Sequence, residues 1–202
     1  MNRVPDHVTH YHRAVRPPFL NVSDAPEADR AELLRRLSAP AELARSHRRF
    51  GSRYLALRAE TEALLRDLFV RAGGRPERTA PHYFVLGSST WFANLYSDVR
   101  EVRLPLAALP AEATSITWTD SIGALALGEH LGVPAPPPAH RQRVYRPDDL
   151  PDLVTRHGLP ADRAPESYEG HQRQPLTSYV EVQLWCDEPV RHLLRPARRL
   201  GT

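Results

Sequence analysis

A single carboxyl group stands within the last strand-like segment of the chain. Residues 179–185 read YVEVQLW, so apolar residues alternate with polar or aromatic ones. In a strand this alternation places the two sets on opposite faces, and Glu181 belongs to the polar set. One carboxyl presented to a cavity can stabilise a developing cation or transfer a proton. The alternative is an edge strand whose second face is exposed to water.

Three histidines lie close together near the start of the chain. The stretch DHVTHYHRAVRPPF (6–19) contains His7, His10 and His12, which could be metal ligands, parts of a nucleotide pocket or members of an ordinary polar strand. A zinc site needs a fourth ligand and supporting carboxylates, whereas the chain has one cysteine, Cys186, and scattered further histidines. We therefore expect no metal, and we keep the nucleotide-contacting strand and the structural strand as alternatives.

Two further segments contain residues suited to a binding site. ITWTDS (116–121) brings Thr119 and Asp120 to the end of a strand, where loops commonly build sites, although Asp120 could also serve only as a helix cap. HYFVLGSSTWFANLY (82–96) is rich in aromatic residues around a Gly-Ser-Ser turn, which is typical of a core and also of a base-stacking surface. The sequence has no GxGxxG, GxxxxGK(S/T), GxSxG or HExxH motif, which removes the commonest nucleotide-binding, hydrolase and zinc-protease signatures.

Four blocks taken in order resemble those of DarT-type ADP-ribosyltransferases. They are HVTHYHRA, PHYFVLGSSTWFANLY, REVRLPLAALPAEATSITWTDS and SYVEVQLW, and they span most of the chain. Members of that family open with a His-x-Thr-His strand, continue with an aromatic segment and a Thr-Asp-Gly turn, and carry a catalytic glutamate on a late strand. The resemblance implies an NAD-cleaving fold with a split, twisted, mostly antiparallel β-core that transfers ADP-ribose to a nucleic-acid base.

The resemblance also assigns roles to individual residues. It implies that Glu181 is the catalytic glutamate and that the site uses an arginine from the segment RRFGSRY, for which we assign Arg53 to catalysis and Arg49 to NAD binding. The implied NAD-binding residues are His7, Thr9, Tyr83 with its neighbour Phe84, Thr119 and Asp120. This chain departs from the family pattern at Ser121, where the family has glycine, and at Tyr179, where the family has glutamine.

Composition favours one globular domain over residues 1–202, with a basic tail at 191–202 that is free to be flexible. Hydrophobic residues make up 41% and charged residues 25% of the 202 positions, which is close to the globular average. All 27 basic residues are arginine, and the net charge of +3 permits binding to a polyanion without requiring it. The sequence shows no signal peptide and no apolar run of membrane-spanning length, so we expect a cytoplasmic protein without a membrane partner.

The order of the predicted elements indicates an α+β fold with N-terminal helices packed on the β-core. Helices are predicted from Pro26, capped by Ser23 or Asp24, to Leu37 and over 41–72, with further helices after Asp120 and up to Gly158. Leu57, Leu64 and Leu68 belong to the apolar stripe that should pack on the sheet. Strands are predicted at 7–12, 82–87, 100–106, 114–118, 143–146 and 179–185.

These observations leave two functional hypotheses. The first is an NAD-dependent ADP-ribosyltransferase-like enzyme that acts on DNA, RNA or, less favoured, protein, with an antitoxin-like protein as a further partner. The second is a non-enzymatic nucleic-acid-binding or scaffold protein that binds a polyanion through the arginine-rich helix 45–78 and the basic tail with Arg191, Arg195, Arg198 and Arg199. A solvated helix face would explain the arginines of 45–78 equally well.

Overall fold

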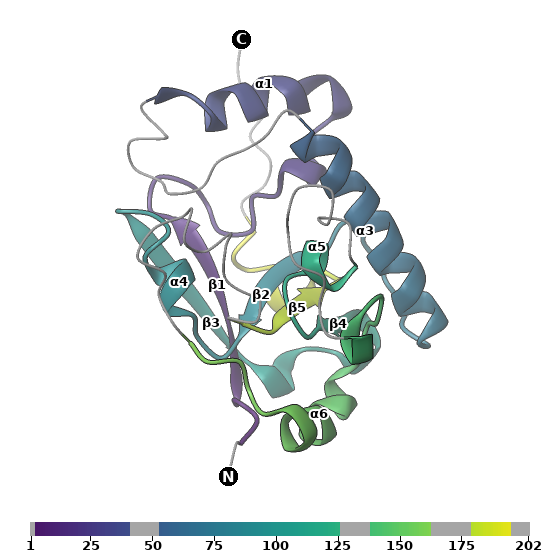
Figure 1. Ribbon diagram of the computed structural model, residues 1–202. Coiled ribbons are helices and arrows are strands. Elements are labelled where there is room, and N and C mark those ends of the chain that lie inside the picture. The colour runs from purple at the N-terminus through teal and green to yellow at the C-terminus, as the bar shows by residue number, and fades with distance from the viewer. Residues whose placement is uncertain (1–2, 41–52, 126–137, 163–178, 195–202) are drawn as a thin grey trace.

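One five-stranded sheet organises the molecule (Figure 1). The computed structural model describes residues 3–40, 53–125, 138–162 and 179–194. The strand order is β3-β1-β2-β5-β4, and every neighbouring pair is antiparallel. The strands are β1 His7–Arg13, β2 His82–Leu86, β3 Val99–Pro105, β4 Thr114–Thr117 and β5 Glu181–Leu184. With the helices around the sheet this is an α+β fold, as the sequence predicts.

The two faces of the sheet differ in chemistry. Residues paired across antiparallel strands point to the same face, so Val8, Phe84, Ile116 and Val182 share one face. That face is the main hydrophobic core, to which helix α6 (Leu150–His157) adds its apolar side chains. Valine, isoleucine and phenylalanine fit a pleated, buried surface well, which explains why these short segments form strands.

The opposite face is polar and is nonetheless buried. The register aligns Thr9, Val85, Glu181 and Thr117 in one row across four strands. The next row contains Tyr83, Gln183 and Ser115. Helices α3 (Tyr54–Arg71) and α5 (Ser121–Ala124) lie on this side, where Leu65, Phe69 and Leu125 pack around Trp185.

β5 is an interior strand. It pairs with β2 on one side and with β4 on the other, and all four of its residues are buried. The edge-strand interpretation of residues 179–185 is therefore wrong. The expected separation of faces is confirmed, because Val180 and Val182 are buried in the main core opposite Glu181.

Most predicted helices are present, with corrected ends. α1 (Glu27–Leu37) begins one residue after Pro26, but neither Ser23 nor Asp24 caps it. Asp24 instead forms an ion pair with Arg78. α6 ends at Gly158, whose φ of 68° is one that glycine adopts readily. The sequence did not predict helix α4, which covers Thr90–Ala93 and is capped by the side chain of Ser89. None of the helices in the described ranges is both long and apolar enough to span a membrane.

The long helix buries polar residues beside its apolar ones. Leu65 and Phe69 are fully buried, together with Thr61 and Glu62, whereas Leu57, Leu64 and Leu68 are only half-buried. Leu64 and Leu68 of the predicted stripe nevertheless pack against the cluster around Trp185, beside the buried polar residues that the helix turns toward the polar face of the sheet. The first part of the predicted helix, 41–52, lies outside the described residues.

One predicted strand is not formed. Residues 143–146 make only an isolated bridge, between Tyr145 and Ile116 of β4. Pro147 follows at once and begins a 3-10 turn (Pro147–Asp149), which leaves no length for a strand.

Candidate active site

Glu181 begins β5 at the centre of the polar face. Its side chain is only 9% exposed, and one carboxylate oxygen accepts a hydrogen bond of 3.0 Å from the Gln183 amide two residues along the strand. β2 and β4 flank it with Val85 and Thr117. The fold therefore presents this carboxyl from a buried, fixed strand.

Burial and a neighbouring acid determine how Glu181 titrates. Burial penalises the charged carboxylate and, with the repulsion of Asp120, raises the pKa of Glu181 to about 7. Hydrogen bonds from Gln183 and Ser121 and the positive charge of Arg58 oppose this rise. A carboxyl with such a pKa exchanges protons near neutral pH, which is the property required of a general acid or base.

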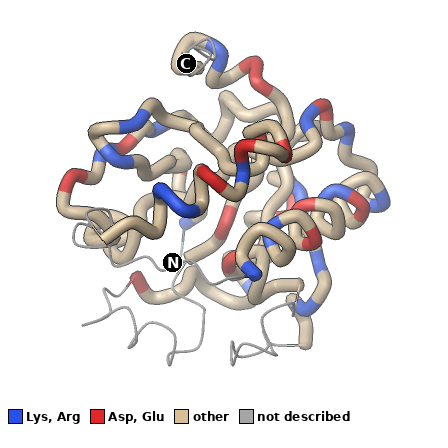
Figure 2. Tube along the Cα trace, turned by 90° about the horizontal axis from the view of Figure 1, so that it is seen from above, with Lys and Arg blue, Asp and Glu red and all other residues tan. Residues whose placement is uncertain are grey.

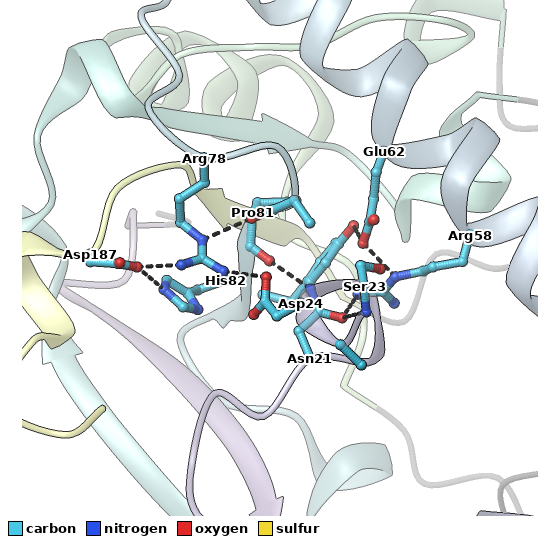
Figure 3. Close-up of polar contacts among 12 residues, drawn as sticks. Asn21, Ser23, Asp24, Arg58, Glu62, Arg78, Pro81, His82 and Asp187 are labelled. Atoms are coloured by element: carbon cyan, nitrogen blue, oxygen red, sulfur yellow. Dashed lines mark hydrogen bonds and ion pairs between the residues drawn. The ribbon is translucent and has the colours of Figure 1, made fainter. Parts of the chain in front are cut away.

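Arg58 brings a buried positive charge to the same face. Its guanidinium lies 4.2 Å from the centre of the Tyr83 ring and makes a 2.6 Å ion pair with Glu62, one turn further along α3. It also donates to the side-chain oxygen of Asn21 (Figure 3), and the Tyr83 hydroxyl donates to Glu62. These contacts fix the guanidinium between α3, β2 and the N-terminal segment.

Asp120 caps a helix and keeps one carboxylate oxygen free of hydrogen bonds to the described residues. One of its carboxylate oxygens accepts a 2.9 Å hydrogen bond from the Gly123 backbone and caps α5. The other oxygen is buried and has no hydrogen-bond partner among the described residues. Burial raises the pKa of Asp120. The preceding Thr119 is buried and donates its hydroxyl hydrogen to the backbone oxygen of Asp120, so it shapes this turn.

β1 places His7 and Thr9 on the same face as Glu181. Thr9 lies in the same cross-strand row as Glu181, but its hydroxyl is bonded at 2.6 Å to the backbone oxygen of Gly87. His7 is half-buried, and its ring nitrogens contact the side chains of Asp6 and Ser88. Of the two, His7 is thus the side chain better placed to meet a ligand.

The other two N-terminal histidines face the opposite side and are held by the backbone. The Nε2 atom of His10 accepts from the Phe19 amide and its Nδ1 atom donates to the Tyr83 carbonyl, so this ring is neutral. Burial lowers the pKa of His10 to about 4. His12 contacts the carbonyl oxygens of Arg13 and Arg16. The three histidines cannot share one ion, and no three acidic, histidine or cysteine residues within the described ranges are grouped to hold a metal.

The structure points to a different arginine from those suggested by the sequence. Arg49 lies outside the described residues, and Arg53 is exposed at the start of α3. Arg58, which sequence reasoning treated as part of a solvated face, is the arginine whose charge reaches Glu181. The sequence does contain one indication of the position of Arg58. It lies four residues before Glu62, and oppositely charged residues at that spacing contact each other on a helix.

The aromatic segment divides between the core and the polar face. Phe84 is buried in the main core, whereas Tyr83 is on the face of Glu181 and under Arg58. Trp91 and Phe92 of α4 pack against Tyr179 and, for Phe92, also against Tyr11. These aromatic rings form a cluster beside the start of β5.

Arginines do not gather into one basic face in the described part of the chain. Figure 2 shows arginines and acids interspersed along the helices and loops. Arg71 pairs with Asp67, and Arg78 holds both Asp24 and Asp187, the latter also bonded to His82 (Figure 3). The predicted polyanion surface also included arginines that lie outside the described residues, namely Arg45, Arg48, Arg49, Arg195, Arg198 and Arg199.

Comparisons with protein families, with curated proteins and with solved structures give no match to this chain.

Proposed function

We propose that this chain is an enzyme that cleaves NAD and transfers its ADP-ribose unit, with Glu181 as the catalytic carboxyl. The observation that carries the proposal is the buried position of Glu181 on an interior strand, with a pKa of about 7. A buried carboxyl that has another acid, Asp120, beside it is a costly occupant of such a position unless it has a function. The resemblance of four sequence blocks to DarT-type ADP-ribosyltransferases suggests the substrate.

The chemistry proposed for Glu181 follows from the bond to be broken. The bond between nicotinamide and ribose breaks, nicotinamide leaves with the bonding electrons, and positive charge develops on the ribose. The carboxylate of Glu181 stabilises that charge and accepts a proton from the attacking group of the acceptor. The new bond joins the ribose to the acceptor, so the products are nicotinamide, the ADP-ribosylated acceptor and one proton.

Other residues on the same face have supporting roles in this proposal. Arg58 favours the ionised state of Glu181, and a guanidinium is also suited to phosphate oxygens. His7 contacts the NAD, and Tyr83 holds Arg58 in place. Thr9, Thr119 and Asp120 shape the strand and turn on which the site is built.

The acceptor proposed is a nucleic-acid base, with protein as the less favoured alternative. The half-buried aromatic cluster of Trp91, Phe92 and Tyr179 beside β5 supports this choice, because aromatic rings stack on exposed bases. The proposal also includes a cytoplasmic location, which the sequence analysis predicts, and regulation by an antitoxin-like protein, which the resemblance suggests.

Release of nicotinamide from NAD tests the proposal directly. The wild-type chain and the Glu181→Gln variant are compared with single-stranded DNA, duplex DNA, RNA and protein acceptors. Glu181→Gln keeps the shape and the Gln183 contact but removes the negative charge, so turnover should fall by about 10²-fold or more. Equal turnover in the two proteins would reject the role of Glu181. Absence of NAD binding by the wild type would favour the non-enzymatic nucleic-acid-binding protein.

A further inference from the structure

A directed chain of hydrogen bonds runs along β4 and β5 to the carboxyl of Glu181. The Trp185 indole nitrogen donates to the Ser115 hydroxyl oxygen at 2.8 Å. Ser115 in turn donates to the side-chain oxygen of Gln183 at 2.7 Å. The Gln183 amide nitrogen then donates at 3.0 Å both to Thr117 and to Glu181. Trp185, Ser115, Gln183 and Thr117 are all fully buried.

The direction of this chain follows from its first member. An indole N–H can only donate, so the Ser115 oxygen accepts there and its own hydrogen is available for Gln183. The Gln183 oxygen therefore faces Ser115, and both of its amide hydrogens face Thr117 and Glu181. A buried amide in the reverse orientation would set its oxygen against the carboxylate and leave hydrogen-bonding capacity unused.

The contacts of Thr117, which lies at the far end of this series of hydrogen bonds, indicate the same direction. Thr117 accepts from Gln183 and donates its own hydrogen to the Thr119 backbone oxygen at 2.8 Å. Its single hydroxyl hydrogen is thus already used, and Thr117 cannot donate to Gln183. The amide of Gln183 is held at both ends by groups of fixed polarity.

We propose that Gln183, oriented by Ser115 and Trp185, is a positioning residue that keeps one oxygen of Glu181 as a hydrogen-bond acceptor and makes the other oxygen the site of proton exchange. The inference rests on the proposed catalytic role of Glu181 and adds which oxygen reacts. We call the hydrogen-bond chain from Trp185 through Ser115 and Gln183 to Glu181 the relay. An amide N–H stabilises the ionised carboxyl, so the relay also limits how far burial can raise the pKa of Glu181.

Other groups around Glu181 lack this selectivity. Asp120 repels the ionised form, whereas Arg58 attracts it, and both act through charge on the whole carboxyl. Tyr83 faces the site from β2, with Glu62 beside it on α3. Ser121 can serve either state of Glu181, because a hydroxyl both donates and accepts. The Gln183 amide N–H differs from the Ser121 hydroxyl in that it can only donate, so it holds the oxygen that it contacts as an acceptor in both states of Glu181.

Nuclear magnetic resonance of the wild-type protein gives a first test. The chain has three tryptophans, so its indole N–H signals can be assigned by Trp→Phe replacement. The Trp185 indole signal should shift with the same midpoint as the Glu181 side-chain carbon, near pH 7. That shift should vanish in Glu181→Gln. A Trp185 indole signal whose chemical shift does not change as Glu181 titrates would reject the proposed role of this hydrogen-bond chain.

Variants provide the second test. Gln183→Met keeps a similar volume and removes the donor, so the pKa of Glu181 should rise by about one unit, the scale for losing a hydrogen bond to a charged group. Trp185→Phe frees the Ser115 hydroxyl and lets the amide reverse, so the pKa should rise in the same direction. Trp118→Phe is the matched control, since Trp118 is buried in the main core and lies outside the relay. It should leave the pKa of Glu181 unchanged.

These titrations separate the inference from the proposed function. They require no NAD, so an inactive protein with a coupled Trp185 would keep the relay and reject the enzyme. An active protein in which Gln183→Met leaves the pKa of Glu181 unmoved would keep the enzyme and reject the relay.

Discussion

At the scale of single residues, the burial that raises the pKa of Glu181 also lowers the free energy of unfolding when the carboxyl is ionised. Burial and Asp120 raise its pKa from 4.5 to about 7. Between these values the unfolded chain ionises the carboxyl while the folded protein keeps it protonated. Stability from this group is therefore fully present below about pH 4.5 and is lost as the pH rises through about 7.

Glu181→Gln should consequently make the protein more stable at alkaline pH. The gain in unfolding free energy should approach roughly 3–4 kcal/mol above pH 8 and shrink toward zero near pH 4.5, from the shift of the pKa. Thermal unfolding across this pH range measures it. Glu60→Gln, which changes an exposed side chain on α3, is the control. A constant difference between Glu181→Gln and wild type at all pH values would contradict the account.

At the scale of elements, α3 contributes a buried ion pair where a surface helix would carry a solvated one. Arg58 and Glu62 are 17% and 6% exposed, whereas Arg71 and Asp67 are 72% and 51% exposed. Both pairs have the same spacing on the same helix. Removal of one partner from the buried pair would leave an uncompensated charge and threaten folding, so paired replacement is the informative change.

The double replacement Arg58→Gln with Glu62→Gln should raise the pKa of Glu181, because Arg58 is the positive charge that lowers it. Titration of the Glu181 side-chain carbon measures this shift. Asp67→Asn with Arg71→Gln removes the exposed pair as a matched control and should leave the Glu181 pKa in place. An equal response to the two double replacements would exclude a specific role for Arg58.

Strand patterns in the sequence predicted the elements well where both faces had a clear character. The alternation at 179–185 correctly separated Val180 and Val182 from Glu181. It could not show that β5 is an interior strand, because pairing partners come from distant parts of the chain. Charged residues on a helix ordinarily face solvent, so the sequence does not single out Arg58 as a buried residue. The Ser115–Gln183 contact joins residues 68 positions apart, and no local pattern reports it.

At the scale of the whole molecule, one face of the sheet forms the hydrophobic core and the other carries the candidate active site. Its apolar face and α6 form the main core, while its polar face, covered by α3 and α5, carries Glu181. Arginines and acids are interspersed along the described parts of the chain (Figure 2). The proposed binding to nucleic acid would therefore rely on individual arginines, because the described residues form no continuous basic face.

Binding to single-stranded DNA or RNA should weaken as salt increases, since phosphate contacts release counterions. With about three such contacts, affinity should fall at least about tenfold between 50 and 200 mM salt. Replacing Arg195, Arg198 and Arg199, which lie outside the described residues, with alanine should reduce affinity for all sequences alike. Arg35→Ala, which changes an arginine paired with Glu32, is the control. Binding that is independent of salt would argue against a phosphate-contacting surface.

The pH dependence of NAD cleavage tests the central claim most directly. We predict that kcat/KM for nicotinamide release rises with pH through a midpoint near 7, because the ionised form of Glu181 stabilises the developing cation. In Glu181→Gln the residual rate should be low and should lack this midpoint. A wild-type rate that does not change between pH 5 and pH 9, or the same midpoint in Glu181→Gln, would contradict the assignment of Glu181 as the catalytic carboxyl.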